Sequence, residues 1–290
     1  MKTGMKDTLV NWIIVGMICI TVLACIVPFF YLIAMSLSSN RAILAQKVGL
    51  LPVDFTLETY KTVLSDKQML YTLAYTIVLT FASTVLSMFL TICAAYPLTK
   101  KRVKGRNAIL VIIVITMYFS GGMIPEYILV KVLNMTDKVW SLLLPGALSV
   151  YNLIILKTFF STIPESMEES ASIEGANELT ILRKIVIPLS LPCLATLSLF
   201  YAVGRWNGFQ DALIYITNPK LFPMQLKLYQ IISANQQLDI QQGEGSIGAY
   251  IAPESLKAAS VMFATIPIIL VYPKLQKYFV SGVMIGAIKE

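Results

Sequence analysis

Long runs of apolar residues constrain this chain more than any other feature. The first extends from about residue 9 to residue 37 without one charged side chain, and it continues apolar past Pro28. About 20 apolar residues suffice for a helix to cross a bilayer. Because backbone polar groups in lipid must be bonded within the segment, and because the runs do not alternate as barrel strands do, they predict helices.

Six such runs predict six transmembrane helices in an all-α, polytopic membrane protein. Composition agrees with this class, since 57% of the 290 residues are hydrophobic and 13% are charged, where soluble domains carry about a quarter charged residues. The mean hydropathy is +0.73. The predicted spans are 9–37, 70–98, 108–130, 139–160, 186–216 and 258–280.

A basic cluster between the second and third spans indicates the orientation of the chain. It consists of Lys100, Lys101, Arg102, Lys104 and Arg106. Cytoplasmic loops are enriched in Lys and Arg, so we expect a multi-pass protein of the plasma membrane with this loop and both termini in the cytoplasm. The net charge of +7 does not predict a nucleic-acid partner, because such a partner requires a solvated basic face.

Several chemistries lack the residues they need. The chain has no histidine, its four cysteines all lie in apolar runs without a Cys-x-x-Cys pair, and no phosphate-binding Gly-x-x-x-x-Gly-Lys loop occurs. We therefore expect no metal site, no disulfide and no bound cofactor in this chain. Glu126 and Asp211 lack a histidine or second carboxylate at helical spacing, so no catalytic residue is predicted.

A polar, charged segment at 161–185 interrupts the apolar runs on the predicted cytoplasmic side. Thr162 and Glu165 have the spacing of a capping box, which predicts a helix start. Gly175 tolerates positive φ and predicts its end, and Asn177 is placed to cap a second short helix.

Such a helical hairpin has two interpretations. It lies on the lipid surface as an amphipathic element, or it binds a protein. Four acidic residues within 165–174 favour the protein, because they would be repelled by an anionic leaflet.

The same segment resembles the coupling signature of importer permeases of the ATP-binding cassette (ABC) class, Glu-Ala-Ala-x3-Gly-x9-Ile-x-Leu-Pro. Ser170 stands where alanine is usual and Ile187 where leucine is usual, and both changes are small in volume. Residues 121–125, 144–147, 206–207 and 276–289 are also similar to the second permease subunit of carbohydrate importers. The resemblance assigns ATPase coupling to Glu169, Ser170, Ala171, Glu174, Gly175, Ala176, Ile185 and Pro188.

The group it resembles most carries polysaccharide fragments and complex oligosaccharides and is related to the smaller maltose permease subunit. The resemblance implies a type I ABC importer permease fold and ATP-driven import, with ATP and Mg bound by partner ATPase subunits. The other implied partners are a homologous second permease, an extracytoplasmic solute-binding protein and the oligosaccharide substrate. A secondary transporter driven by an ion gradient is the alternative, and it would need intramembrane carboxylates or internal repeats.

This resemblance implies three regions and a docking segment. Residues 1–69 form an N-terminal transmembrane helix with an outer segment, residues 70–280 form the permease core that includes the loop 161–185, and residues 281–290 form a cytoplasmic tail. Residues 225–250 are expected to reach the solute-binding protein, with a plain linker as the alternative.

Polar residues inside the predicted spans are candidates for the substrate path, since they do not face lipid comfortably. Trp206 could stack on a sugar, and Arg205 could meet a hydroxyl or the carboxylate of an acidic sugar. The alternative is that Trp206 and Asn207 only hold helices together. Pro188 and Pro192 predict a kink at the start of the fifth span. The candidates are Tyr118, Ser120, Asn152, Arg205, Trp206, Asn207, Gln210 and Asp211.

Overall fold

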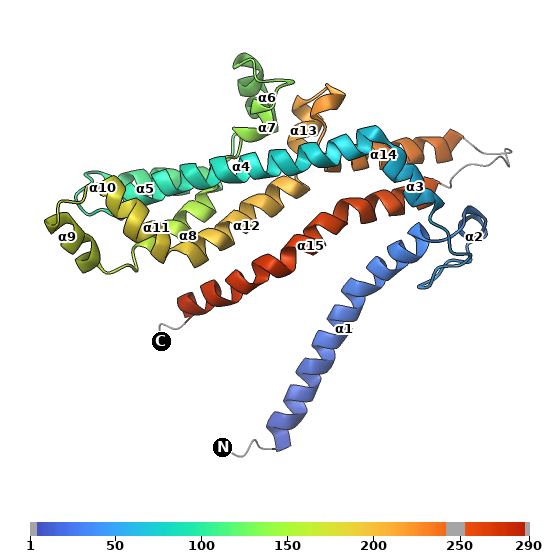
Figure 1. Ribbon diagram of the computed structural model, residues 1–290, viewed down its shortest axis with the longest axis horizontal. Helices are drawn as coiled ribbons and strands as arrows, with labels where there is room; N and C mark the ends of the chain where they lie inside the picture. The colour runs from blue at the N-terminus through green and yellow to red at the C-terminus, as the bar shows by residue number, and fades with distance from the viewer. Residues whose placement is uncertain (1–4, 242–252, 288–290) are drawn as a thin grey trace. The chain divides into compact units, whose positions relative to one another are not determined.

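The computed structural model describes residues 5–241 and 253–287 (Figure 1). Within these ranges every regular element is a helix, which confirms the all-α prediction. The chain divides into two compact units, Met1–Leu70 with Leu228–Pro267 and Tyr71–Lys227 with Ile268–Glu290.

The first unit contains α1 (Met5–Ser36), α2 (Asn40–Leu44), α3 (Glu58–Ser65) and the beginning of α15 (Pro253–Ala287). Its small core joins Met35, Ile43 and Ala258. Large apolar side chains of α1 between Val10 and Tyr31 are exposed. A long apolar helix with bare sides suits a lipid environment.

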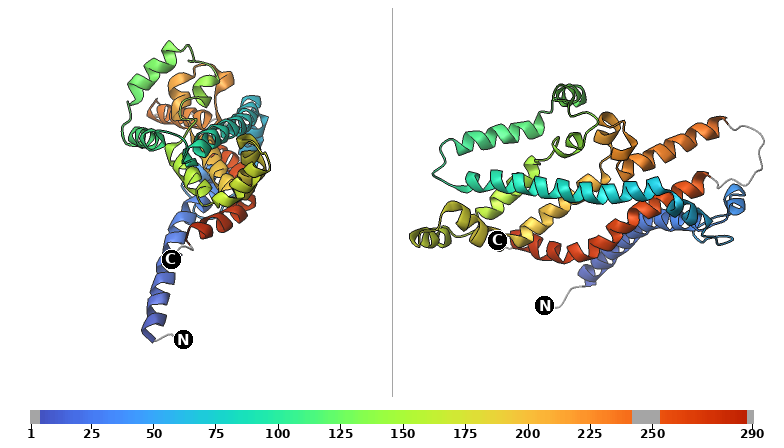
Figure 2. Two further views of the ribbon diagram at one scale, coloured as in Figure 1. Left: turned by 90° about the vertical axis from the view of Figure 1, so that its left-hand side faces the viewer. Right: turned by 45° about the horizontal axis from the view of Figure 1, so that its top comes forward.

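The second unit holds most of the remaining helices, and Figure 2 shows them in two further views. Its longest element, α4, runs along the unit, with the shorter helices packed beside it. Its helices are α4 (Lys67–Thr99), α5 (Arg106–Tyr118), α6 (Met123–Val132), α7 (Trp140–Leu143), α8 (Val150–Phe160), α9 (Glu165–Ile173), α10 (Glu178–Ile181), the π-helix η1 (Leu182–Val186), α11 (Ile187–Leu189), α12 (Leu191–Asn207), α13 (Gln210–Tyr215), the 3-10 helix η2 (Pro219–Leu221), the start of α14 (Met224–Gln241) and the part of α15 from Ile268 on.

The prediction of six spans is not confirmed. Among the described residues, three helices are long and apolar enough to cross a membrane: Val10–Ser36, Lys67–Thr99 and Glu254–Val271. Two further candidates are bent pairs, one of 112° between α5 and α6 and one of 82° between Glu178–Leu189 and Leu191–Asn207. The predicted span 139–160 contains only α7 and the 11-residue α8.

Glycine and proline explain these breaks. Gly122 has φ of 86° directly before α6, and Gly146 has φ of 69° between α7 and α8, conformations that side-chain-bearing residues avoid. Pro188 and Pro192 flank the break at Ser190, which confirms the predicted kink. Bent helices inside a protein leave backbone groups free to line a cavity.

Two buried clusters pack along α4. One joins Tyr96 and Leu98 of α4 to α8 and α10–α12. The other joins Leu79 to α6, α7, α13 and the segment around Phe222. One face of α4 is polar and buried along much of the helix, and it carries Thr72, Thr76, Ser83, Ser87 and Thr91.

The roles of the regions 1–69, 70–280 and 281–290 stay a prediction. In the segment 225–250, α14 extends to Gln241, and residues 242–252 lie outside the described residues. At the other end, α15 continues to Ala287.

Candidate functional site

Residues 164–185 form a compact helical hairpin, called the hairpin below. The helix α9 ends in a Schellman motif, in which the Gly175 N–H donates to Ser172 O (3.1 Å) and the Ala176 N–H to Ala171 O (2.9 Å). Gly175 has φ of 84°, as expected from its position. Asn177 then caps α10 by accepting the Thr180 N–H at 2.9 Å, which confirms the predicted second helix.

The predicted capping box is wrong. The Thr162 hydroxyl donates to Phe159 O at 2.7 Å, and Pro164 occupies the N-cap of α9 without a side-chain hydrogen bond. Thr162 still belongs to the turn that ends α8, so its hydroxyl satisfies a carbonyl of that helix rather than an N–H of the next one.

The hairpin leads into α12 through a short π-helical segment. The π-helix η1 comes directly before α11, where Pro188 supplies no N–H for a regular α-helical bond. No loop longer than the single residue Ser190 separates η1 and α11 from α12. The hairpin is therefore joined to α12 through a single-residue connection, at which the chain bends by 82°.

The residues that the resemblance assigns to coupling divide between two sides of the hairpin. Ala171, Ala176 and Ile185 pack against the buried cluster formed with α4, α8 and α12. The side chains of Glu169, Ser170 and Glu174 are exposed, and so is Gly175. Pro188 lies in α11, past the hairpin.

Apolar side chains of the hairpin are also exposed. Ile173 is 88% exposed at the tip, and Met167 and Leu179 are 43% and 53% exposed. These side chains are therefore available for contact with a partner or with lipid.

Three ion pairs join the hairpin to the basic loop 100–105, a feature that the sequence did not reveal. Lys100 pairs with Glu168, Lys101 with Glu165 at 2.7 Å, and Arg102 with Glu178. The hydrogen bond and charge of Lys101 lower the pKa of Glu165. Two of the four acidic residues within 165–174 thus have partners in this chain.

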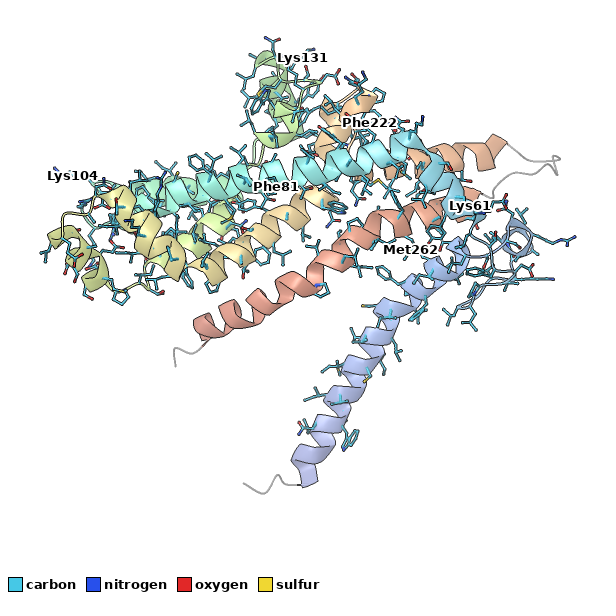
Figure 3. The ribbon with its side chains drawn as sticks, in the orientation of Figure 1. Lys61, Phe81, Lys104, Lys131, Phe222 and Met262 are labelled. Carbon is cyan, nitrogen blue, oxygen red and sulfur yellow. The ribbon has the colours of Figure 1, made fainter. Side chains whose placement is uncertain are left out.

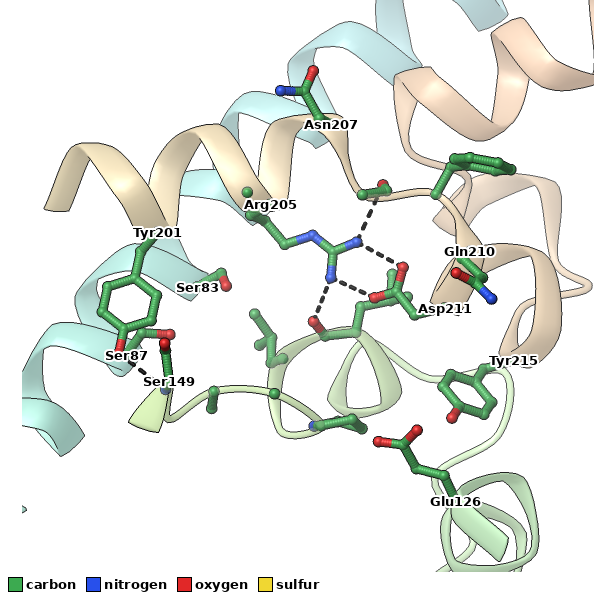
Figure 4. Close-up of a pocket in the computed structure, with 18 of the residues that line it drawn as sticks. Ser83, Ser87, Glu126, Ser149, Tyr201, Arg205, Asn207, Gln210, Asp211 and Tyr215 are labelled. Carbon is green, nitrogen blue, oxygen red and sulfur yellow. Dashed lines mark hydrogen bonds and ion pairs between the residues drawn. The ribbon is translucent and has the colours of Figure 1, made fainter. Parts of the chain in front are cut away.

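A pocket of about 960 Å³ lies within the second unit (Figure 4). Its volume is at the upper end of the range for small-ligand sites. Hydroxyl and amide groups dominate the polar part of its wall, together with two carboxylates and one guanidinium. The polar lining residues are Ser83, Ser87, Ser120, Glu126, Ser149, Tyr151, Asn152, Tyr201, Arg205, Asn207, Gln210, Asp211 and Tyr215.

Arg205 is bound within the wall of this pocket. Its guanidinium donates to both carboxylate oxygens of Asp211 at 2.5 and 2.9 Å and to Leu142 O at 2.9 Å. A weaker bond reaches Gly208 O at 3.4 Å. The Arg205 side chain is only 9% exposed. Arg205 thus fastens the break between α12 and α13 to α7, and its charge is neutralised by Asp211 (Figure 4).

Tyr201 connects three elements beside the same pocket. Its hydroxyl hydrogen-bonds Thr91 Oγ1 of α4 at 2.7 Å and accepts the Ser149 N–H at 3.1 Å. Ser83 and Ser87 of α4 line the pocket on this side. The sequence signal that was missed is the four-residue spacing of Ser83, Ser87 and Thr91, which places small polar groups on one helix face.

Six of the eight candidates from the sequence come together in this pocket: Ser120, Asn152, Arg205, Asn207, Gln210 and Asp211. Trp206 is not part of the lining and is 7% exposed. Tyr118 is 75% exposed at the end of α5 and does not line the pocket either. Whether the six residues contact a substrate stays a prediction.

These features together define a membrane permease, with broken apolar helices around a polar pocket and a helical hairpin leading into one of those helices. The family described as the binding-protein-dependent transport system inner membrane component matches residues 87–285, and the chain belongs to this family.

Two further comparisons agree over nearly the whole chain. The polygalacturonan/rhamnogalacturonan transport system permease protein YtcP of Bacillus subtilis (strain 168) is 40% identical over 98% of this chain and 100% of its own length. A chain of a bacterial ABC transporter involved in the import of the acidic polysaccharide alginate superposes with a TM-score of 0.86 at 34% identity, covering 96% of this chain and 99% of that chain.

A chain from a bacterial alginate ABC transporter in complex with an alginate pentasaccharide-bound periplasmic protein has a TM-score of 0.56 at 16% identity, over 93% of this chain and 94% of that chain. These findings confirm the type I importer permease fold.

Proposed function

We propose that this chain is a transmembrane permease subunit of an ATP-driven ABC importer for oligosaccharides or polysaccharide fragments. The observation that carries the proposal is the hairpin. It combines the coupling signature with a turn closed by the Schellman motif, an exposed apolar side chain at Ile173 and a connection of one residue to α12. Membership of a binding-protein-dependent family favours ATP-driven import over a transporter driven by an ion gradient.

In this proposal, the hairpin faces the cytoplasm and docks on an ATPase subunit, which binds the ATP and Mg. Both chain termini then also lie in the cytoplasm of a multi-pass plasma-membrane protein. A short helical hairpin closed at Gly175 transmits a displacement that a floppy loop would absorb. Gly204, Arg205 and Asn207 lie at the far end of α12 and line the pocket, so ATPase motion reaches the pocket wall. The chain supplies no catalytic group.

The cargo follows from the chemistry of the pocket and from the relatives. Hydroxyl and amide groups, such as those of Ser87, Asn152 and Gln210, hydrogen-bond sugar hydroxyls. The names of the relatives given above refer to the transport of polygalacturonan, rhamnogalacturonan and alginate. These three polysaccharides support an oligosaccharide cargo. A homologous second permease completes the route, and an extracytoplasmic solute-binding protein delivers the sugar.

Affinity purification tests the proposal. The chain, tagged at its C-terminus, is extracted from native membranes in mild detergent and the proteins recovered with it are identified by mass spectrometry. We expect a second permease, an ATPase and a solute-binding protein. The solute-binding protein is then screened against oligogalacturonides and neutral oligosaccharides. Recovery of the chain alone, or only with copies of itself, would contradict the proposal.

A further inference from the structure

The end of α4 is fastened to both helices of the hairpin. Lys100, the residue after α4, pairs with Glu168 of α9. Its ammonium also lies 4.3 Å from the ring centroid of Tyr96. The Tyr96 hydroxyl donates to Glu178 of α10 at 2.9 Å. Lys100 and Tyr96 thus hold α9 and α10 together. We call these contacts of Lys100 and Tyr96 with Glu168 and Glu178 the junction.

The junction is more buried than an ordinary cluster of charged side chains at a surface. The side chains of Lys100 and Glu168 are 15% and 22% exposed, whereas those of Lys101 and Glu165 are 72% and 66% exposed. Exposed pairs contribute little because water and salt screen them, and partial burial strengthens the attraction. Among these contacts, the Lys100 pair is therefore the one that fixes geometry.

Apolar packing around Tyr96 also stabilises the junction. Tyr96 is 7% exposed and its ring meets the edge of Phe160 at a centroid distance of 6.5 Å. Both belong to the buried cluster that includes Ile181 of α10 and Val186 of η1. The junction therefore has an apolar base beneath its charged surface.

Lys104 shows what a loop cation does without such contacts. It is exposed, and in the described part of the chain it forms no ion pair. Figure 3 labels it at the same end of the second unit as α9 and α10. Lys104 has the features expected of a cation whose role is limited to membrane orientation. Lys100 differs from it, because Lys100 also contacts Glu168 and Tyr96.

We propose that the hairpin and the end of α4 move as one rigid body, with Lys100 and Tyr96 as positioning residues. This inference rests on the proposed function and deepens it. The hairpin continues into α12, which lines one wall of the pocket, while α4 lines another through Ser83 and Ser87. ATPase motion is then delivered to both walls at once, rather than only through the spans that flank the hairpin in sequence.

A distance measurement tests the rigid body directly. Spin labels are placed at Lys104→Cys on the loop and Ser166→Cys on α9, two exposed positions, in a chain whose four native cysteines are replaced. The assembled complex in nanodiscs is measured by pulsed electron resonance without nucleotide and after trapping with ATP and vanadate. We expect one narrow distance that is the same in both states.

Charge variants supply the control. Glu168→Gln breaks the junction, and we expect it to broaden the distance distribution and to lower vanadate-sensitive ATP hydrolysis by at least about fivefold, as loss of a partly buried charge contact predicts. The exchange Lys100→Glu with Glu168→Lys restores opposite charges but not the cation over the Tyr96 ring, so it should recover part of that loss, which a simple packing defect would not. Lys104→Gln, made in the unlabelled chain, should leave ATP hydrolysis unchanged.

The outcomes are distinguishable. A wild-type distance that shifts between the two nucleotide states, with the ATPase present, would overturn the rigid body alone. Unchanged hydrolysis in Glu168→Gln, or no recovery in the charge exchange, would remove the positioning role. Absence of any ATPase from the purified complex would overturn the proposed function, and this inference with it.

Discussion

Loss of the Arg205 guanidinium should destabilise the second unit substantially. In the variant Arg205→Met, the Asp211 carboxylate keeps only the Ala212 N–H at 2.9 Å, and Leu142 O loses its donor. Breaking a buried ion pair from one side costs about 3–5 kcal/mol. Because Asp211 is 27% exposed and water in the pocket can reach it, we expect a value near the lower end, about 3 kcal/mol.

The double variant Arg205→Met with Asp211→Asn should be more stable than Arg205→Met alone. It leaves no unpaired charge, so the expected loss is about 1–1.5 kcal/mol, the contribution of ordinary hydrogen bonds. The double variant is then more stable than Arg205→Met by about 1.5–2 kcal/mol. The single variant Asp211→Asn completes the double-mutant cycle, which measures the coupling between the two positions.

Thermal unfolding of the purified complex measures these differences. Cys193 of α12 is 7% exposed, so its reaction with a fluorescent maleimide, read on the gel band of this chain after Cys19, Cys25 and Cys93 are replaced, reports local unfolding. A loss of 3 kcal/mol corresponds to about 6–12 °C. A midpoint within about 2 °C of wild type, or additive losses in the cycle, would refute the structural role of the ion pair.

Three further changes probe single positions. Gly208→Ala places a Cβ 3.2 Å from the Arg205 Nη2 atom, so it should weaken the guanidinium bonds by about 1 kcal/mol. The matched change Gly204→Ala inside α12 meets nothing within 4 Å and should not lower the unfolding midpoint. Gly175→Val forces a β-branched residue to φ of 84°, at a cost of about 1–3 kcal/mol. This variant should abolish transport and leave membrane insertion intact. The control Gly175→Asn, in which the side chain tolerates this φ, should retain most uptake. Hydrogen bonds from the Thr217 and Asn218 N–H groups lower the pKa of Asp137, so these bonds are present above the ordinary carboxyl range and are lost as pH falls through the lowered pKa. The protection of those two amides, relative to the exchange rate of a free chain at the same pH, should fall in acid, and Asp137→Asn should remove this pH dependence.

Local signals in the sequence predicted local structure well. Gly175 and Asn177 act within one turn of the chain, so their spacing sufficed to predict the end of α9 and the start of α10. The same kind of rule failed at Thr162, because the last turn of α8 competes for that hydroxyl. A cap assignment needs the end of the preceding helix, which periodicity in an apolar run does not define.

Contacts between residues far apart in the chain could not be predicted from the sequence. The basic loop satisfied the positive-inside rule, and nothing in its spacing indicated that Lys100 meets Glu168, 68 positions further along the chain. Candidate pocket residues were predicted only where polar groups were conspicuous, as in 204–211. Ser83 and Ser87 were missed because a serine bonded to its own helix is common in apolar spans.

The central claim is that the hairpin transmits ATPase motion, and cross-linking from its tip tests it most directly. A photo-activatable phenylalanine analogue at Ile173, the residue that is 88% exposed, is irradiated in native membranes. The account predicts a dominant cross-link between this chain and an ABC ATPase subunit, weakened when Gly175→Val distorts the turn. Cross-links only to lipid or within the chain itself would contradict it.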